Sequence, residues 1–219
     1  MDYAEDLRKL FREHADAEKA HLMSAYMRGQ FQFFGIRSPE RKELTKQFLK
    51  KHGNPASLED AILKLWAFEE RELQYAAVDM LERNKKQLCG KDMVWLKTAI
   101  TTESWWDTVD LIASNIIGPL VKKEPSLRER YLDEWAEAEN IWLVRTAILH
   151  QLKYKANTDE AWLYRVIAQN SSSKEFFIQK AIGWALREYS KTAPASVKAF
   201  AENHTLAPLS RREGLKYVQ

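Results

Sequence analysis

The chain has 219 residues, of which 45% are hydrophobic and only one, Cys89, is a cysteine. This length fits one large domain or two small ones, and no stretch is apolar and long enough to span a membrane. The charged, amphipathic start MDYAEDLRKLFREHAD lacks the apolar core and cleavage site of a secretory signal, so we expect a cytoplasmic protein. A single cysteine excludes disulfides within the chain and cysteine-based zinc sites.

The charge is unevenly distributed along the chain, although the net charge is only +3. Residues 1–50 carry ten Lys/Arg and eight Asp/Glu, residues 51–140 carry twelve and seventeen, and residues 141–219 carry twelve and six. The basic final third is suited to a polyanionic partner such as nucleic acid. A solvated basic face is the alternative interpretation.

Helical periodicity runs through nearly the whole sequence. Apolar residues recur at i, i+3, i+4 and i+7, alternating strand-like runs are missing, and only seven glycines and six prolines occur. In chain order, breaks are expected near 53–55, 90, 124–125, 157–159 and 194, which gives about ten to thirteen helices. Helix starts with a serine cap are predicted at Ser38, Ser104, Ser172 and Ser210.

Four helix centres resemble one another, which indicates an internal repeat. The segments YAAVDML, WDTVDLI, RTAILHQ and KAIGWAL are centred on residues 77, 108, 147 and 181. Their spacing of about 31 to 39 residues is slightly shorter than the roughly 40 residues of a HEAT-type helical pair. The sequence therefore predicts a single all-α domain over residues 1–219, a HEAT-like helical-repeat α-solenoid with a concave basic groove. An irregular helical bundle is the alternative.

The stretch ESWWDTVD at 103–110 combines two tryptophans with two aspartates. If Ser104 is the N-cap, Asp107 stands at N3, where its carboxylate can bond back to the cap and face the positive end of the helix dipole. Trp105 heads an apolar stripe that continues at 109, 112 and 116, and it is expected to pack in the core. These assignments give Asp107 and Trp105 structural roles.

Trp106 and Asp110 remain without a capping or core role. They are four residues apart and therefore share one helix face, where a surface Trp beside a solvated Asp is the simplest interpretation. Two other residues, each on another of the repeated helices, favour a functional site that includes Trp106 and Asp110. Arg145 shares an apolar face, where a guanidinium is unfavourable unless it reaches an anion or the rim of a groove. Trp184 follows a glycine in IQKAIGWALREY.

The sequence resembles the AlkD family of bacterial DNA alkylation-repair glycosylases at these residues. The matching stretches are AYMRGQFQFFGIRSPER, SWWDTVD, NIWLVRTAILHQLKYK, SSKEFFIQKAIGWALREYSKT and LAPLSRREGLKY, which cover almost the whole chain. By this resemblance Trp106 and Asp110 form the catalytic centre, Trp184 is the second tryptophan of the cleft, and Arg145 holds the DNA backbone near the lesion. Tyr26 matches a family tyrosine near the DNA.

The resemblance also implies the reaction, which is hydrolytic excision of cationic N3- or N7-alkylated purines from duplex DNA without base flipping. A cationic base can leave as a neutral molecule, so what the reaction needs is a carboxylate beside the developing oxocarbenium ion and a positioned water. Asp110 is suited to both tasks, and the two indole faces attract cations. No lysine adjoins Trp106 or Asp110 as a Schiff-base nucleophile, so we expect a monofunctional hydrolase.

Further DNA contacts are expected from basic residues in the C-terminal third. Lys174, Arg211 and Arg212 lie beside the predicted starts of two helices, whose N-termini attract phosphate, although a solvated cation explains them equally well. Arg187, in the fourth matching stretch, is a further candidate. The five histidines are scattered without metal-ligand spacing, so we expect no metal and no nucleotide cofactor. A monomer without an obligate protein partner is the simplest assembly.

Two other classes of protein remain as alternatives. One is a non-catalytic helical-repeat protein that binds damaged or branched DNA, although such a binder has no need for a carboxylate facing a polyanion. The other is a protein-interaction scaffold, which helical repeats often form. Affinity for duplex DNA that falls steeply with salt would exclude the scaffold.

Overall fold

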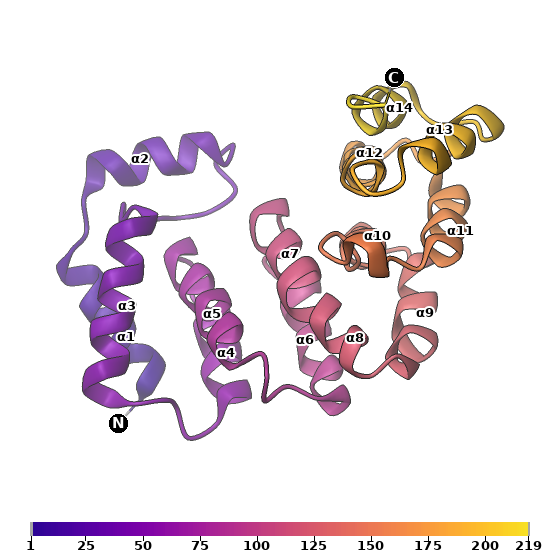
Figure 1. Cartoon of the computed structure of the whole chain (residues 1–219). Helices are drawn as coiled ribbons and strands as arrows, with labels where there is room; N and C mark the ends of the chain where they lie inside the picture. The colour runs from indigo at the N-terminus through magenta and orange to yellow at the C-terminus, as the bar shows by residue number, and fades with distance from the viewer. Residues whose placement is uncertain (1, 219) are drawn as a thin grey trace. The chain divides into compact units, whose positions relative to one another are not determined.

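The computed structural model describes residues 2–218, and this part of the chain is all-α (Figure 1). It contains no β-strand, only one isolated bridge between Gln32 and Glu70. Because α7, η2 and α8 form one continuous helix, the fourteen labelled α-helices amount to thirteen within the described part. The all-α prediction is confirmed. None of the helices within 2–218 has the length and apolar character needed to cross a bilayer.

The chain folds into two compact units, residues 1–86 and 87–219, with the structure described from 2 to 218. The first unit contains α1 (Tyr3–Glu13), α2 (Ala17–Tyr26), α3 (Ser38–His52), α4 (Leu58–Trp66) and α5 (Arg71–Asn84). Helices α4 and α5 form a pair, and α1 and α3 pack against them. Its core includes the fully buried side chains of Leu7, Phe11, Leu65 and Leu73.

A buried carboxylate holds the long connection between α2 and α3. Glu72, fully buried on α5, accepts backbone N–H bonds from Phe34 at 3.0 Å, Gly35 at 2.8 Å and Ile36 at 3.0 Å. Gly35 has a φ of +93°, and a Cβ there would lie 2.1 Å from the Asp16 carbonyl oxygen, so only glycine fits. One side chain thus satisfies three buried donors that no helix could pair.

The second unit contains η1 (Gly90–Asp92), α6 (Met93–Thr101), α7 (Trp106–Ile112), η2 (Ala113–Ile117), α8 (Gly118–Lys123), η3 (Arg128–Leu132), α9 (Asp133–Ala136), α10 (Ile141–Leu149), η4 (Lys155–Asn157), α11 (Glu160–Asn170), α12 (Phe176–Ser190), α13 (Pro194–Asn203) and α14 (Pro208–Gly214). Helices α7, α10, α12 and α14 pack in series, while α6, α9, α11 and α13 each precede one member of the series along the chain (Figure 1). This is the arrangement of a helical-repeat stack.

The helical-repeat prediction is therefore confirmed. Three of the four resembling segments lie on α7, α10 and α12, and the fourth lies on α5 of the first unit. Each of these helices is the second of a pair. The single domain and the concave basic groove stay predictions.

The serine caps predicted from the sequence are wrong. Helix α7 begins at Trp106, and Ser104 instead donates to the Ile100 carbonyl at 2.7 Å. Helix α12 is flanked by Glu175 rather than Ser172, and Ser38 is the first residue of α3, with Arg37 at the cap position. Ser210 lies inside α14, is fully buried and donates to the Gln179 carbonyl at 2.9 Å. Serine can bond to a preceding helical turn as readily as cap a new one, and the sequence pattern does not separate the two.

A π-helical turn at Ala113–Ile117 follows α7, and the next residue, Gly118, lies against the end of α10. A Cβ on Gly118 would lie 2.2 Å from the carbonyl oxygen of His150, so glycine is required for the backbones to approach. The hydroxyl of Tyr154 donates to the Gly118 carbonyl at 2.6 Å and fixes the contact. The two helices that carry Asp110 and Arg145 are thus tied together beyond these residues.

Candidate functional site

Asp110 occupies the middle of α7, on the side that packs against α10. The helix forms here because Trp105 adopts an extended backbone before it, and Asp107 places a negative charge in its first turn. Val109 and Ile112, on the apolar stripe, are fully buried. The stripe is therefore confirmed.

Asp110 is expected from the sequence to be solvated, but it is buried: only 8% of the residue is exposed. Its carboxylate forms a bidentate ion pair with Arg145 on α10: Nε lies 2.7 Å from Oδ1 and Nη2 lies 2.8 Å from Oδ2. Arg145 is equally enclosed, with 4% exposed. Of the two environments expected for this guanidinium, an anion or the rim of a groove, the structure shows an anion, and that anion is Asp110.

Burial and pairing act on the Asp110 carboxyl in opposite directions. Removal from water raises the pKa of Asp110 above its ordinary value, while the hydrogen bonds and charge of Arg145 oppose the rise and Asp107 adds a little to it. Two parallel N–H···O contacts require both carboxylate oxygens as acceptors, which fits the ionised form. A carboxylate has about four lone-pair positions, so each oxygen can still accept a second hydrogen bond.

The ion pair is held from its far side by the first turn of α12. The remaining guanidinium nitrogen of Arg145, Nη1, donates to the backbone carbonyl of Phe177. The Phe177 ring also packs with two indoles, with centroids 5.0 Å from that of Trp105 and 4.9 Å from that of Trp142. Trp105 thus packs as predicted, although it is half-buried in this aromatic cluster rather than enclosed in the core.

Sequence reasoning missed the aromatic cluster and the Phe177 carbonyl. Trp142 and Phe177 stand in the stretches that carry Arg145 and Trp184, so aromatic residues beside the candidate positions were a usable signal. A backbone carbonyl leaves no trace in a sequence. The pairing of Asp110 with Arg145 was also missed, although both lie on resembling helices.

Trp106 and Trp184 are half-buried, on α7 and α12 respectively. Within the described residues, neither indole forms a hydrogen bond, a ring contact or a cation–π contact. Trp106 lies one helical turn before Asp110, as predicted. Helix α12 packs against α10, so Trp184 belongs to the same series of helices.

The basic candidates for DNA contact differ in how free they are. Lys174 and Arg212 are exposed and have no hydrogen-bond or ion-pair partner between residues 2 and 218. Arg211 donates to the Ala201 carbonyl. Arg187 pairs with Glu213 at 2.8 Å.

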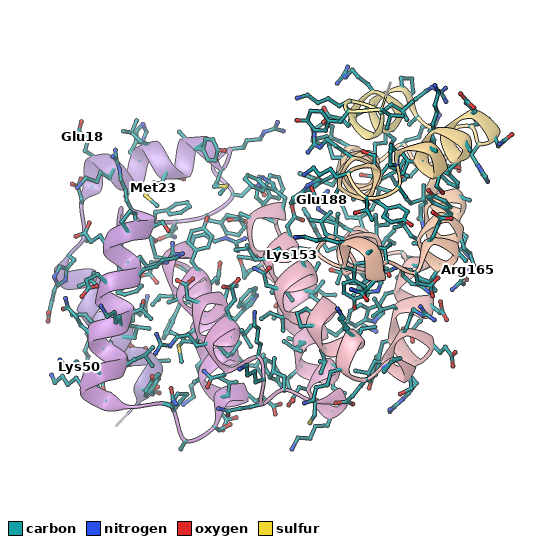
Figure 2. The ribbon with its side chains drawn as sticks, viewed as in Figure 1. Glu18, Met23, Lys50, Lys153, Arg165 and Glu188 are labelled. Carbon is teal, nitrogen blue, oxygen red and sulfur yellow. The ribbon has the colours of Figure 1, made fainter. Side chains whose placement is uncertain are left out.

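Other cations of this unit are paired on its surface. Arg165 on α11, labelled in Figure 2, lies 2.5 Å from Asp133. Local pairs of this kind reduce the charge available to a polyanion. The basic final third therefore has fewer unpaired positive charges for a polyanion than its composition indicates.

Tyr26 belongs to the first unit, where it ends α2. It is 73% exposed, and no residue of α2 is buried. With Met23, labelled in Figure 2, and Leu22 it borders an apolar cavity of 280 Å³ whose wall includes Phe33 and Tyr75. An exposed tyrosine on a lightly packed helix is free to contact a partner.

Metal ligands do not cluster in the described part of the chain. No three His, Cys, Asp or Glu side chains gather there in a way that could hold an ion. Cys89 is a free, half-buried thiol.

The fold defines a helical-repeat protein in which the buried pair of Asp110 and Arg145 joins two adjacent repeats. Comparison with known proteins identifies the family: the DNA alkylation repair enzyme family matches residues 7–218. The chain therefore belongs to the DNA alkylation repair enzymes, as the resemblance predicts, and its role lies in DNA repair. A search of curated proteins gave no significant match.

Solved structures agree with this assignment. A predicted DNA alkylation repair enzyme from Enterococcus faecalis is 38% identical, with a TM-score of 0.86 over 93% of this chain and 96% of that chain. AlkD2 from Streptococcus mutans is 18% identical, with a TM-score of 0.62 over 81% of this chain and 90% of that chain. Protein smu.31 from Streptococcus mutans UA159 is 17% identical, with a TM-score of 0.63 over 81% and 92%. The last two share the fold.

Proposed function

We propose that this protein is a monofunctional DNA glycosylase that hydrolyses the glycosidic bond of cationic N3- or N7-alkylated purines in duplex DNA. The observation that carries the proposal is the Asp110 carboxylate, which is buried, fixed by two hydrogen bonds and one helical turn from an unpaired indole. A charge that is already oriented and desolvated stabilises a developing cation without reorganisation.

In the proposed reaction the alkylated base carries a positive charge and leaves as a neutral molecule. The sugar then develops oxocarbenium character at C1′, beside the Asp110 carboxylate. The free lone pairs of this carboxylate orient the water and accept its proton as the new C–O bond forms. The indoles of Trp106 and Trp184 attract the cationic base or sugar by about 0.5 to 2 kcal/mol each.

The DNA itself is bound by contacts that do not depend on sequence. Lys174 and Arg212 are free to meet phosphates, and exposed Tyr26 supplies a further contact. Arg187 and Arg211 must exchange their present partners for phosphate oxygens. Three of the five N–H groups of Arg145 serve Asp110 and Phe177, so its role in the proposal is to hold Asp110, and a phosphate contact would use the remaining two.

The test is base release from a duplex that carries a single N7-methylguanine, measured as free base and as an abasic site. Asp110→Asn should bind the duplex and lose base release by about a hundredfold or more, the order of loss seen when one preorganised electrostatic contact is removed from an active site. The matched control is Asp133→Asn, which removes another ion-paired aspartate of the same unit and should stay active. Full activity of Asp110→Asn in folded protein would overturn the assignment.

One observation favours the second candidate, a non-catalytic protein that binds damaged DNA. Asp110 is engaged by Arg145 on both oxygens, which is what a purely structural ion pair between helices would show. In that case wild-type protein binds the N7-methylguanine duplex and releases no base. The same experiment separates the two.

A further inference from the structure

A cavity of about 390 Å³ lies between the C-terminal ends of α10 and α12, away from the Asp110–Arg145 pair. Its floor is apolar and is formed by Ile148, Leu152, Leu163 and Ala185. Arg145 contacts the first turn of α12, whereas the cavity touches Ala185 and residues after it. The cavity begins about one helical turn beyond Arg145 on α10 and just beyond Trp184 on α12, and neither of these residues lines it.

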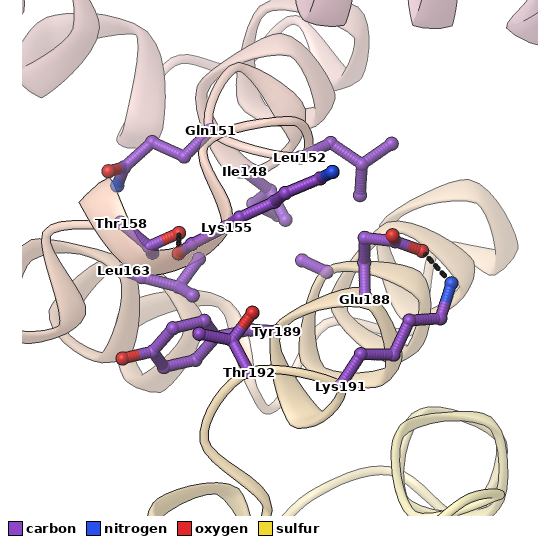
Figure 3. A pocket seen from close by; sticks show the side chains of 11 residues that line it. Ile148, Gln151, Leu152, Lys155, Thr158, Leu163, Glu188, Tyr189, Lys191 and Thr192 are labelled. Atoms are coloured by element: carbon purple, nitrogen blue, oxygen red, sulfur yellow. Dashed lines mark hydrogen bonds and ion pairs between the residues drawn. The ribbon is translucent and has the colours of Figure 1, made fainter.

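The polar groups around the cavity are almost all occupied by local partners. Gln151 is tied at both ends to the backbone of Asp159, and the Tyr189 hydroxyl donates to Glu160 at 2.9 Å. Figure 3 shows the Tyr189 hydroxyl directed away from the cavity. These groups shape the wall without offering a hydrogen bond to an occupant.

Lys155 and Thr192 are the exceptions. Neither the Lys155 ammonium nor the Thr192 hydroxyl has a hydrogen-bond or ion-pair partner in the described part of the chain, and the Lys155 side chain extends along one side of the cavity (Figure 3). Lys155 adopts a φ of +54°, a left-handed conformation that residues other than glycine rarely take. Arg28 and Glu103 adopt the same conformation, so what points to a ligand is the unpaired charge of Lys155 beside the cavity.

The charge of the lining selects the kind of ligand. Glu188 and Lys191 lie on the opposite side and neutralise each other, with Oε2 and Nζ 2.6 Å apart. Lys155 therefore leaves a net charge of one positive unit beside an apolar floor and an aromatic wall. A volume of about 390 Å³ lies within the usual range for small-molecule sites.

We propose that this cavity binds a small organic monoanion with an apolar body, whose acidic group pairs with Lys155. The apolar body fills the floor between α10 and α12, and the anion meets the one uncommitted cation. The site is separate from the proposed glycosylase activity and does not depend on it. A bound ligand links α10, which carries Arg145, to α12, which carries Trp184.

The probe is naphthalene-2-carboxylate, titrated into the full chain by calorimetry. The expected result is one site per chain, with affinity about twofold to fivefold weaker for the neutral isostere naphthalene-2-carboxamide, because an ion pair with an exposed lysine is lost. Lys155→Met should weaken binding of the carboxylate by about the same factor and leave binding of the amide unchanged. Ala185→Leu should abolish binding of both by filling the floor.

The matched control is Lys91→Met, which removes another exposed lysine of the same unit and should bind as the wild type does. Thermal unfolding of each variant identifies any that fails to fold, and Lys155→Met tests the proposal even if Ala185→Leu does not fold, since Lys155 is exposed. No binding to the wild type overturns the proposal. Equal binding of carboxylate and amide, or unchanged binding by Lys155→Met, overturns it as well.

Discussion

The Asp110–Arg145 pair offers the most direct test of how the two central helices of the site are held. Both side chains are nearly enclosed, with 10% and 5% of their side-chain surfaces exposed. Solvent screening is therefore weak, and removal of one partner leaves the other charge buried without compensation. We expect Arg145→Met, which keeps the aliphatic bulk, to lower the free energy of unfolding by about 3 to 5 kcal/mol.

A double-mutant cycle separates the pairing from the rest of the contacts. Asp110→Asn alone should also destabilise the protein, because it leaves the Arg145 charge without its partner. The double variant Asp110→Asn/Arg145→Met contains no buried charge at this position, so it should be more stable than Arg145→Met alone. A coupling energy of about 2 kcal/mol or more is expected for two groups in one buried network.

The assay is urea unfolding followed by circular dichroism and tryptophan fluorescence. DNA affinity of each folded variant is measured in parallel at several salt concentrations. If Arg145→Met is as stable as the wild type, and its binding to DNA loses about one unit of salt slope, Arg145 contacts a phosphate and the structural argument is refuted.

Three further predictions concern stability. Complete burial lowers the pKa of His150 from 6.5 to about 4, so the unfolded chain gains the proton first as the pH falls. About 3 kcal/mol of stability that is present above pH 6.5 should therefore be lost by about pH 4. The urea midpoint of His150→Gln should depend less on pH than that of the wild type. Glu72→Ala strands three buried N–H groups and should cost about 3 kcal/mol or more, with faster proteolysis between α2 and α3. Gly118→Ala forces a Cβ against the His150 carbonyl and should lower stability by about 1 to 3 kcal/mol in the same urea assay, whereas an unchanged midpoint would contradict the close approach.

The sequence predicted the helices well because their pattern is carried by side-chain periodicity, which local chemistry determines. It predicted the stripe at 109 and 112 and the shared face of Trp106 and Asp110 for the same reason. It failed at the serine caps, since Ser104 and Ser210 bond to a preceding turn and to a neighbouring helix. Tertiary partners decide such bonds, and no local pattern contains them.

The burial of Asp110 was missed for a related reason. A carboxylate on a helix face is expected in solvent unless a partner is known, and the partner here comes from a helix 35 residues further along the chain. The cost of burying Arg145 indicated that it needs an anion. Asp110, already singled out as a candidate site residue, could have been recognised as that anion. An unfavourable residue in each of two neighbouring repeats is thus evidence for a pair.

The ion pair determines how the proposed activity should depend on pH. In the proposed reaction Asp110 acts as a carboxylate, so base release should fall on the acidic side as this group is protonated. Because burial raises the pKa of Asp110, that fall should occur above the ordinary value of 3.8. Arg145 opposes the rise, so Arg145→Met should move the acidic limb to still higher pH and leave less activity at neutral pH.

Single-turnover rates on the N7-methylguanine duplex, corrected for spontaneous depurination at each pH, measure this limb directly. An acidic limb at the same pH in Arg145→Met and wild type, in protein that remains folded, would mean that Asp110 is not the titrating group. Arg145 would then not be needed to keep Asp110 ionised for catalysis. The pair would serve only as a structural link between α7 and α10.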